Sequence, residues 1–381
     1  MSKVKLISLD SINVRVQRLC NSLLEKNNDV EVLLLERKEI NNEFDYVEEC
    51  VDNIRIKRFF CRGKSNTDNY GRIRKKIIYT LWFLNFIVKI NRYLKENDCD
   101  YIIAQANIGT FAGLLAKRKN TILIYDMREL YEGRGNKISK ILKAFNSFLI
   151  RKSDYVIYLN EKQKSLINKK YHYKLIYLPN YVSKNQYKKI EKTKSNYIRV
   201  SYIGCPRDEK SLENFVRAGC TFDNFKIYIH GYGTAYDKLK KLEGEYENLK
   251  VTGKFDGIND SEKLFQDTDV LFCGYDTNNI NWKNAIAVKF YESIITLTPI
   301  IVFENSVMGN LVKKYGNGFL INKNNVESFK KTFKTINVDN INRIKKNIKK
   351  IQYDFIWEEI IKNIDFISDG SNKENRSKNG H

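Results

Sequence analysis

The residue types best suited to chemistry gather in three short segments in the second half of this 381-residue sequence. In the first segment, Gly204 follows an apolar run that predicts a strand, and Arg207 and Lys210 stand where the next run predicts the start of a helix. Glycine lets the backbone approach a ligand, a helix N-terminus favours an anion, and the two cations add full charges. The segment therefore suits a phosphate or diphosphate, although an ordinary turn in contact with water explains the same residues.

Glycines also follow the next two predicted strands. Gly231 and Gly233 end one of them, and Gly253, Lys254 and Phe255 end the other. Loops of this kind can lie against a flat ligand, whereas a lone pair of glycines is more often a simple turn.

The third segment runs from Asn284 into a predicted helix over Lys289–Ile295. Lys289 and Glu292 are three residues apart, so they share one face of that helix. A carboxylate there can accept hydrogen bonds from both hydroxyls of a ribose. The alternative interpretation of the pair is a surface salt bridge.

Elements that could position these residues are visible along the whole chain. Apolar runs with strand character alternate with helical runs in both halves, which predicts an α/β fold with two doubly wound parallel sheets. We expect one domain over residues 1–182, a Lys-rich linker over 183–197, a second domain over 198–351 and a disordered tail over 367–381. Folds of this kind bind ligands beyond the carboxyl ends of their strands, so the site should lie in a central cleft.

Composition excludes several classes of protein. Hydrophobic residues make up 42% of the chain and aromatic residues 13%, too much for a disordered protein. The seven cysteines form no C-x-x-C pair, so neither a disulfide scaffold nor a zinc ribbon fits, and we expect reduced thiols in a cytoplasmic protein. The N-terminus lacks the pattern of a secretory signal, and the apolar run Ile77–Val88 is too short to cross a bilayer.

The positive charge is unevenly distributed. Of the formal net charge of +22, the first 200 residues carry +19. A cationic cluster stands at the start of a predicted apolar helix, formed by Arg72, Arg74, Lys75 and Lys76. Basic residues beside aromatic ones suit an anionic membrane surface, which we expect at the inner face of the cell membrane. For the central turns, Leu81–Val88, a buried core helix is the better interpretation.

In this order, the three segments resemble the nucleotide-sugar domain of the GT-B glycosyltransferases, in particular the retaining glycosyltransferase family 4. The resemblance covers most of the chain, and it extends to the segments Ser8-Leu9-Asp10, Tyr125-Asp126-Met127-Arg128-Glu129, Leu178-Pro179-Asn180 and Phe355-Ile356-Trp357-Glu358. It implies two Rossmann-like domains that face a central cleft, with a last helix at about 352–366 that crosses back to the first domain.

The resemblance also implies roles in donor binding. Arg207 and Lys210 would neutralise the donor diphosphate, Lys289 would lie near the phosphates, Glu292 would bind the ribose, and the loop 253–255 would border the base.

Two positions depart from the family pattern. Asn284 stands where many members have the first of two glutamates, so either Asn284 hydrogen-bonds a sugar hydroxyl or the backbone amides from Asn284 to Val288 hold the distal phosphate. Arg128 stands where many members have His. Asp126, Arg128 and Glu129 would lie in the acceptor cleft, but a buried pair of Arg128 with a carboxylate is an equally good interpretation.

The predicted function is a metal-independent hexosyltransferase that moves a sugar, with UDP-sugar as the favoured donor, to a hydroxyl of a glycan or lipid-linked acceptor. The family implies retention at the anomeric carbon and a role in bacterial surface polysaccharide or glycolipid synthesis. Asp267 and Asp269 are interpreted as a helix end rather than a metal site, and His230 as a structural residue. A sugar-nucleotide epimerase on the same fold and a nucleic-acid-binding protein are the alternatives, but the sequence contains no recognised nucleic-acid module.

Overall fold

A computed structural model describes residues 1–9, 12–36, 46–60, 72–128, 137–187, 190–257 and 259–362. The chain divides into two compact units. The first consists of Met1–Pro179 with the residues from Glu359 onward, and the second of Asn180–Glu358.

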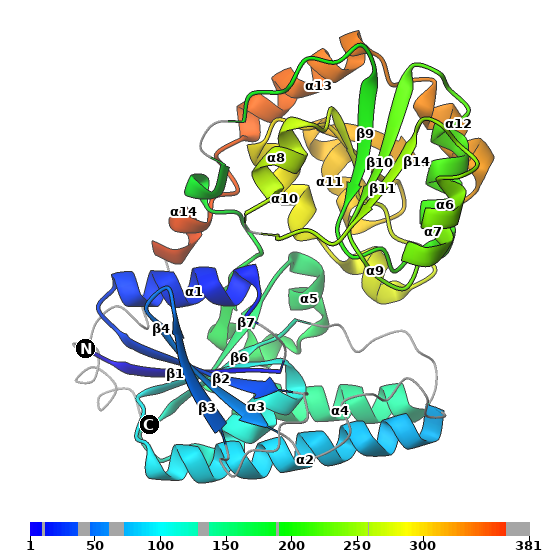
Figure 1. Ribbon diagram of the computed structural model, residues 1–381. Coiled ribbons are helices and arrows are strands. Elements are labelled where there is room, and N and C mark those ends of the chain that lie inside the picture. Colours follow the sequence, from blue (N-terminus) through cyan, green and yellow to red (C-terminus); the bar gives the residue numbers. More distant parts are fainter. Residues whose placement is uncertain are drawn as a thin grey trace. The chain divides into compact units, whose positions relative to one another are not determined.

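The first unit is built on one sheet whose described strands lie in the order β3-β4-β2-β1-β5-β6-β7-β8 (Figure 1). These strands are β1 (Lys3–Ser8), β2 (Asp29–Glu36), β3 (Tyr46–Val51), β4 (Ile54–Phe60), β5 (Tyr101–Gln105), β6 (Ile122–Asp126), β7 (Tyr155–Tyr158) and β8 (Leu175–Tyr177). All neighbours pair in parallel except β3 and β4. The parallel strands are apolar on both faces because helices cover them.

The antiparallel strand β3 was not predicted from the sequence. Asp52 and Asn53 join it to β4, and both have positive φ angles, of 49° and 65°. Two successive residues of this kind match the right-handed twist of a hairpin, and Asp and Asn tolerate that conformation better than most residues. The Asp-Asn pair before Ile54 was the available signal.

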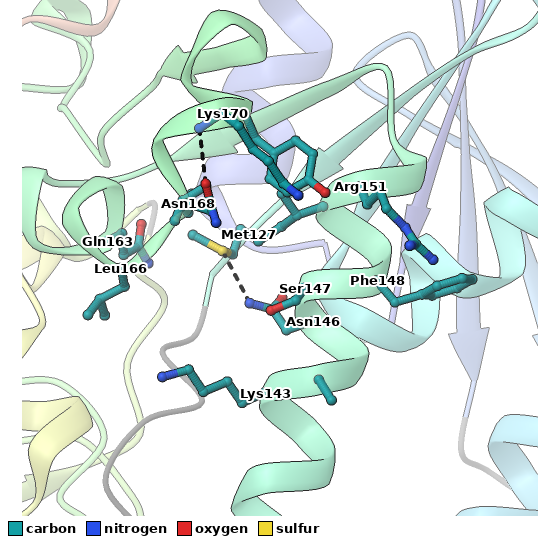
Figure 2. A pocket seen from close by; sticks show the side chains of 14 residues that line it. Met127, Lys143, Asn146, Ser147, Phe148, Arg151, Gln163, Leu166, Asn168 and Lys170 are labelled. Carbon is teal, nitrogen blue, oxygen red and sulfur yellow. Dashed lines mark hydrogen bonds between the residues drawn. The ribbon is translucent and has the colours of Figure 1, made fainter.

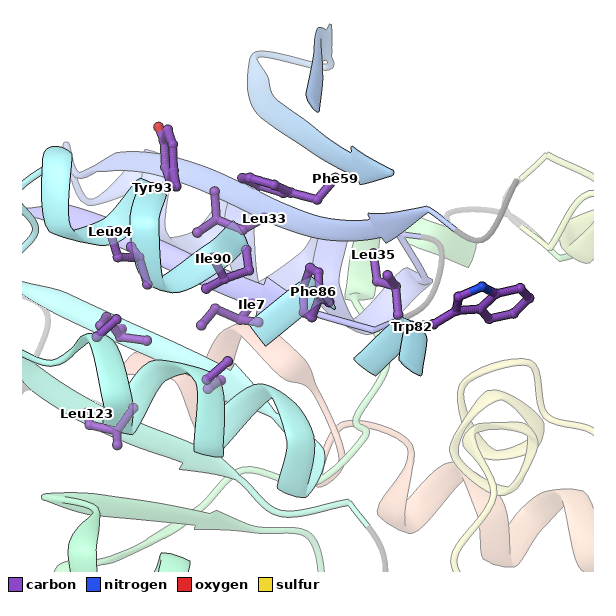
Figure 3. Close-up of a cluster of buried hydrophobic side chains, with 14 residues drawn as sticks. Ile7, Leu33, Leu35, Phe59, Trp82, Phe86, Ile90, Tyr93, Leu94 and Leu123 are labelled. Atoms are coloured by element: carbon purple, nitrogen blue, oxygen red, sulfur yellow. The ribbon is translucent and has the colours of Figure 1, made fainter. Parts of the chain in front are cut away.

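The helices of the first unit are α1 (Val14–Glu25), α2 (Arg72–Glu96), α3 (Ala106–Ala116), α4 (Lys137–Lys152), α5 (Glu161–Leu166) and the 3-10 helix η1 (Lys169–Lys174). Helix α1 begins after Asn13, whose side chain accepts hydrogen bonds from the amides of Arg15 and Val16. Helix α3 packs against both α2 and α4. Trp82, Phe86 and Ile90 of α2 belong to a buried core with residues of β1 and β2 (Figure 3).

The second unit contains a parallel sheet in the order β11-β10-β9-β12-β13-β14 (Figure 1). Its strands are β9 (Ile198–Ile203), β10 (Phe225–His230), β11 (Leu249–Gly253), β12 (Val270–Phe272), β13 (Ile300–Phe303) and β14 (Gly318–Ile321). Its helices are η2 (Lys184–Tyr187), α6 (Glu209–Gly219), α7 (Tyr236–Leu242), α8 (Ser261–Gln266), α9 (Ile280–Asn284), α10 (Val288–Ile295), α11 (Val307–Tyr315), α12 (Val326–Phe333), α13 (Val338–Ile351) and the start of α14 (Trp357–Lys362). The α/β class with parallel sheets is confirmed.

The described residues of the range 183–197, expected to form a linker, pack against the second unit. The Lys192 ammonium donates to the carbonyls of Phe265 and Thr268 and to the hydroxyl of Thr298 at 2.6–2.7 Å. The ring of Tyr187 lies 5.6 Å from that of Phe265. The segment is therefore part of the second unit rather than a free connection, because its few buried side chains find partners there.

The last described helix, α14, begins at Trp357, later than the start at about 352 that the sequence led us to expect. The Trp357 amide donates to the carbonyl of Val182, and the helix is described as far as Lys362. Its residues from Glu359 belong to the first unit, where the Lys26 ammonium donates to the carbonyl of Ile361 at 3.3 Å. The predicted disordered tail, 367–381, lies outside the described residues.

Candidate functional site

Loops that follow parallel strands meet at one edge of a sheet, and in the second unit this edge collects the glycines singled out in the sequence. The Gly204 amide donates to the carbonyl of His230 at 2.9 Å, and the Gly231 amide donates to that of Gly253 at 2.8 Å. The loops after β9, β10 and β11 are thus joined to one another through their backbones.

Gly231 is the residue that this close approach requires. Its φ angle is 137°, and a Cβ atom there would lie 1.7 Å from the carbonyl oxygen of Gly204. At Gly233 a Cβ would lie 2.7 Å from the carbonyl oxygen of Pro206. The two glycines therefore allow the loop after β10 to press against the loop after β9.

Arg207 and Lys210 flank the N-terminus of α6, and both side chains are exposed. Arg207 Nε donates to the Cys205 sulfur at 3.4 Å. Between the two cations lies Asp208, which is buried and was not singled out in the sequence. It accepts from the amides of Ser211 at 3.2 Å and of Asp276 at 2.6 Å, so it ties the loop after β9 to the loop after β12. An Asp immediately before a predicted helix was the signal that could have found it.

Lys289 and Glu292 form an ion pair on α10. Lys289 Nζ lies 2.6 Å from Glu292 Oε2, and the Glu292 side chain is 4% exposed. The surface-salt-bridge interpretation is therefore wrong, because the carboxylate is enclosed. Burial raises the pKa of the neighbouring Cys273 thiol to about 12, and Lys289 lowers that pKa while Glu292 raises it. Cys273 directly follows β12, so the pair lies near the start of the loop after that strand.

The Lys289 ammonium also faces the loop after β11. Its Nζ lies 5.9 Å from the ring centre of Phe255 and 5.4 Å from that of Phe265. At the exposed rim of the same loop, Lys254 Nζ lies 5.3 Å from the ring centre of Tyr232. Two cations of this region, Lys254 and Lys289, therefore lie over aromatic rings.

Asn284 is the last residue of α9, and extended backbone connects it to α10. No side chain caps the N-terminus of α10, whose N-cap residue is Ala287. The first amides of that helix therefore remain available for an anion.

The polar residues near this edge, Asp267, Asp269 and His230, have partners within the protein. Asp267 and Asp269 both pair with Arg199, at 3.2 Å and 3.0 Å, and Asp267 caps the end of α8. His230 is buried, and its Nδ1 lies 3.0 Å from the Thr252 hydroxyl oxygen. Burial lowers the His230 pKa to about 4, so the imidazole is neutral at pH 7. Across the described ranges, no three His, Cys, Asp or Glu side chains come together in a way that could hold a metal ion.

In the first unit, Asp126 ends β6 and is fully buried. Arg15 Nη2 lies 3.1 Å from its Oδ1, and Arg128 Nε lies 3.3 Å from its Oδ2. Burial raises the Asp126 pKa, but the two guanidinium groups outweigh it and hold the pKa below its usual range. The buried pairing of Arg128 is thus observed, while Arg15 was missed because it lies 111 residues away. Glu129 lies outside the described residues.

Two amide side chains at the same edge were also missed. Gln105 and Asn107 are buried, at 3% and 5% exposure, and neither Gln105 Nε2 nor Asn107 Nδ2 has a hydrogen-bond partner among the described residues. Ala106 between them has a φ angle of 57°, unusual for a residue other than glycine. Polar residues directly after the predicted strand Tyr101–Ala104 were the signal.

The predicted membrane-contact cluster opens α2. Arg74 is exposed, and the side chains of Arg72, Lys75 and Lys76 lie outside what the structure describes. The expectation that Leu81–Val88 is core is wrong for one face of the helix. Ile77, Leu81, Leu84 and Val88 are 54–58% exposed, because a helix on the outside of a sheet buries only one face. Nowhere in the described residues is there a helix both long and apolar enough to span a membrane.

Residues 183–352 match the family described as Glycosyl transferases group 1. A curated relative, an uncharacterized glycosyltransferase of Methanocaldococcus jannaschii, is 26% identical over 137 residues, which are 32% of this chain and 35% of the relative. The matched stretch thus spans about a third of that relative's length.

Solved structures resemble the chain over nearly its whole length. Sucrose-phosphate synthase from Thermosynechococcus elongatus has a TM-score of 0.74 at 14% identity, and the similarity covers 96% of this chain and 97% of that one. Anabaena HepE in complex with UDP-glucose has a TM-score of 0.66 at 13% identity, over 96% and 98% of the two chains. At these identities the similarity establishes the fold.

Proposed function

We propose that this chain, whose residues 183–352 match the family Glycosyl transferases group 1, transfers a hexosyl residue from a UDP-sugar to a hydroxyl of a glycan or lipid-linked acceptor. The observation that carries this proposal is the buried Lys289–Glu292 pair behind the uncapped start of α10. That HepE, a protein of the same fold, is found in complex with UDP-glucose supports the choice of nucleotide.

Glu292 is the group we assign to the ribose. A carboxylate has lone pairs on both oxygens and can accept from two hydroxyl donors. The loop 253–255 would border the base, where Phe255 offers a flat apolar surface. Burial of the carboxylate strengthens these hydrogen bonds, because water competes less for them.

Charge stabilisation is the chemical contribution we assign to the second unit. When the bond to the anomeric carbon breaks, the nucleoside diphosphate takes the electron pair and gains negative charge. Positive groups near the strand ends can stabilise this charge: the side chains of Arg207, Lys210 and Lys289 and the amides at the start of α10. They lower the barrier to breaking the bond, because the negative charge of the leaving group develops close to them. With these cations to stabilise the leaving group, the proposed transfer requires no metal ion.

The segment from Asn284 to Val288 can contact the donor in one of two ways. The Asn284 side-chain amide can hydrogen-bond a sugar hydroxyl, or the amides from Asn284 to Val288 can hold the distal phosphate. The uncapped start of α10 favours the second contact. Retention at the anomeric carbon is the outcome we expect from the family.

In the first unit we assign the acceptor to the carboxyl edge of β5 and β6. Arg15 and Arg128 neutralise Asp126, and its lowered pKa makes this carboxylate a weak base. Asp126 is therefore best suited to hold Arg128 in position. The buried amides of Gln105 and Asn107 supply hydrogen-bond donors of the kind that sugar hydroxyls accept.

We also propose that the protein is cytoplasmic and lies on the inner face of the cell membrane, in surface polysaccharide or glycolipid synthesis. The exposed apolar face of α2 follows the basic residues that begin the helix, and the first 200 residues carry +19 of the net charge of +22. Apolar side chains insert at the interface while cations attract anionic head groups. Replacing Leu81, Leu84 and Val88 by Ser should abolish sedimentation with phosphatidylglycerol vesicles, whereas Val338→Ser in the second unit should not. Unchanged sedimentation of the triple variant would contradict this surface.

The donor proposal is tested by thermal stability with UDP, GDP, ADP and CMP. A nucleotide that binds only the folded protein raises its melting temperature. We expect UDP to do so, Glu292→Gln to lose the effect, and the exposed control Glu327→Gln to keep it. No stabilisation by any of the four at millimolar concentration would reject the donor site. Product analysis then separates the reactions, because a transferase releases UDP whereas an epimerase returns a changed sugar nucleotide.

A further inference from the structure

Asp208 lies between the two cations at the start of α6, and both of its carboxylate oxygens accept a hydrogen bond. Its Oδ1 accepts from the Ser211 amide at 3.2 Å, which caps α6, and its Oδ2 accepts from the Asp276 amide at 2.6 Å. Asp208 is 7% exposed, and Leu212 and Phe215 of α6 are buried in the core of the second unit. The carboxylate is therefore a fixed point to which the loop after β12 is attached.

The segment attached to Asp208 has little packing of its own. Residues 275–289, all of which the structure describes, include no buried residue. Helix α9, which lies within this segment, likewise buries none of its five residues. Because such a segment has few apolar contacts to hold it, its position depends on its hydrogen bonds.

Hydrogen bonds connect Asp276 to the start of α9. The Asp276 carboxylate accepts from the Asn278 amide at 3.0 Å, and the Asp276 carbonyl accepts from the Asn279 amide at 3.1 Å. The Asn279 side chain in turn accepts from the amides of Asn281 and Trp282, and so caps α9. Since extended backbone joins α9 to α10, a displacement of Asp276 shifts the chain that leads to the first amides of α10.

The chemistry of the Asp208 side chain indicates a role beyond capping. Ser, Thr or Asn caps a helix as well as Asp does, because one acceptor atom is enough. Two amides held on two oxygens need a group that accepts at both, which a carboxylate does and a side-chain amide does not. A negative charge between the cations of a diphosphate site also repels that anion, so the charge of Asp208 by itself opposes donor binding.

We propose that Asp208 is a positioning residue for the donor. Through Asp276 it holds the loop after β12 in the place where the first amides of α10 contact the distal phosphate. This inference rests on the proposed function, which assigns that phosphate to these amides. Asp208 acts on this part of the donor alone, because the base and the ribose are assigned to the loop 253–255 and to Glu292.

The test compares UMP and UDP, which differ only in the distal phosphate, by isothermal titration calorimetry on the full-length protein. We expect the wild type to bind UDP at least tenfold more tightly than UMP. In Asp208→Asn one oxygen still caps α6, but an NH2 group faces the Asp276 amide. The preference for UDP should therefore fall below threefold, whereas the affinity for UMP should change less than threefold.

A second variant covers the case in which Asp208→Asn folds poorly. Asp208→Ser keeps a hydroxyl that can cap α6 and has no second acceptor, so it should give the same two results. Tighter binding of UDP in these variants would overturn the proposal, because the carboxylate would then act only as a repelling charge. Equal losses of UMP and UDP affinity would also overturn it, because Asp208 would then only maintain the fold.

Two variants in the second unit are matched controls. Glu209→Gln removes a negative charge from the next residue, whose carboxylate pairs with Lys238 at 2.8 Å. Asn337→Ala removes a helix cap, since the Asn337 side chain accepts from the Asn340 amide at the start of α13 at 2.9 Å. Each should change the preference for UDP less than twofold.

A third control lies in the first unit. A cavity of about 450 Å³ lies there between α4 on one side and α5 with η1 on the other, and Lys170 is one of the residues that line it (Figure 2). The Lys170 amide donates to the Asn168 side chain at 3.1 Å, and the Lys170 ammonium lies 5.0 Å from the ring centre of Tyr171. Lys170→Gln should leave both affinities within twofold of the wild type.

The wild-type measurements separate this inference from the proposed function. If the wild type binds neither nucleotide, the donor proposal fails. If it binds UMP and UDP equally, the site for the base and ribose stands, but the distal phosphate is not held and the assignment of Asp208 fails. If it prefers UDP and both Asp208 variants keep that preference, only the assignment of Asp208 fails.

Discussion

The Lys289–Glu292 pair allows a quantitative test of the donor site. Removal of one partner of a buried ion pair typically costs about 3–5 kcal/mol, because the remaining charge is left in a poorly solvated place. Here Glu292 is almost fully enclosed and Lys289 is 19% exposed. Lys289→Met should therefore lower the free energy of unfolding by about 3 kcal/mol, since it leaves the enclosed carboxylate alone.

The opposite substitution should be milder. Glu292→Gln keeps the shape of the side chain and leaves an ammonium that still reaches water, so we expect a loss of about 1 kcal/mol. The double variant should lose about 2 kcal/mol rather than the sum, because neither buried charge remains. The coupling free energy between the two residues is then about 2 kcal/mol.

Urea denaturation of the four proteins, followed by circular dichroism and by fluorescence, measures this cycle. Coincident transitions are needed, since the chain has two units. Additive losses would refute the argument that the two charges depend on each other. UDP stabilisation should be absent in Glu292→Gln and in the double variant. Removing both charges restores stability, but it does not restore the carboxylate that we assign to the ribose.

Three further outcomes follow from other parts of the structure. Gly231→Ala should lower the free energy of unfolding by at least about 2 kcal/mol and abolish UDP stabilisation. A Cβ atom there would collide with a carbonyl oxygen, and the φ angle is positive. The control Gly257→Ala, where a Cβ meets nothing within 4 Å, should be nearly neutral in the same urea titration. In the folded protein His230 has a pKa of about 4, below the ordinary 6.5. Its contribution to the free energy of unfolding is therefore complete above pH 6.5 and falls by up to about 3 kcal/mol as the pH drops to 4. In His230→Gln this part of the pH dependence, measured by urea denaturation, should vanish. Asp126→Asn should lower the free energy of unfolding by about 3 kcal/mol, because two guanidinium groups lose the carboxylate between them. The melting temperature should fall accordingly, and an unchanged value would show that this cluster does not stabilise the fold.

The sequence was sufficient for the α/β class, because alternating strand-like and helical runs have only a few ways to bury their apolar faces. It was also sufficient to find the glycines that end β10 and β11. Glycine is informative in sequence since a close backbone contact such as that of Gly231 excludes any other residue. The antiparallel strand β3 was missed because a solvent-facing edge strand lacks the apolar run that marks a buried one.

For the candidate site, sequence spacing placed Lys289 and Glu292 on one face of a helix, since that relation is local. It did not reveal that the carboxylate is enclosed, because burial depends on loops that are distant in sequence. Arg15 was missed as a partner of Asp126 for the same reason.

What the sequence determined by itself is therefore local: helix and strand periodicity, turn glycines, residues that share a helix face, and a strong excess of positive charge in the first half. Only the tertiary structure decided which of these residues are buried and which long-range partners they have. It decided that Asp126 lies between Arg15 and Arg128 and that one face of α2 is exposed. The physical reason is that periodicity follows from bonds between near neighbours, whereas burial and electrostatic environment are set by the packing of segments a hundred residues apart.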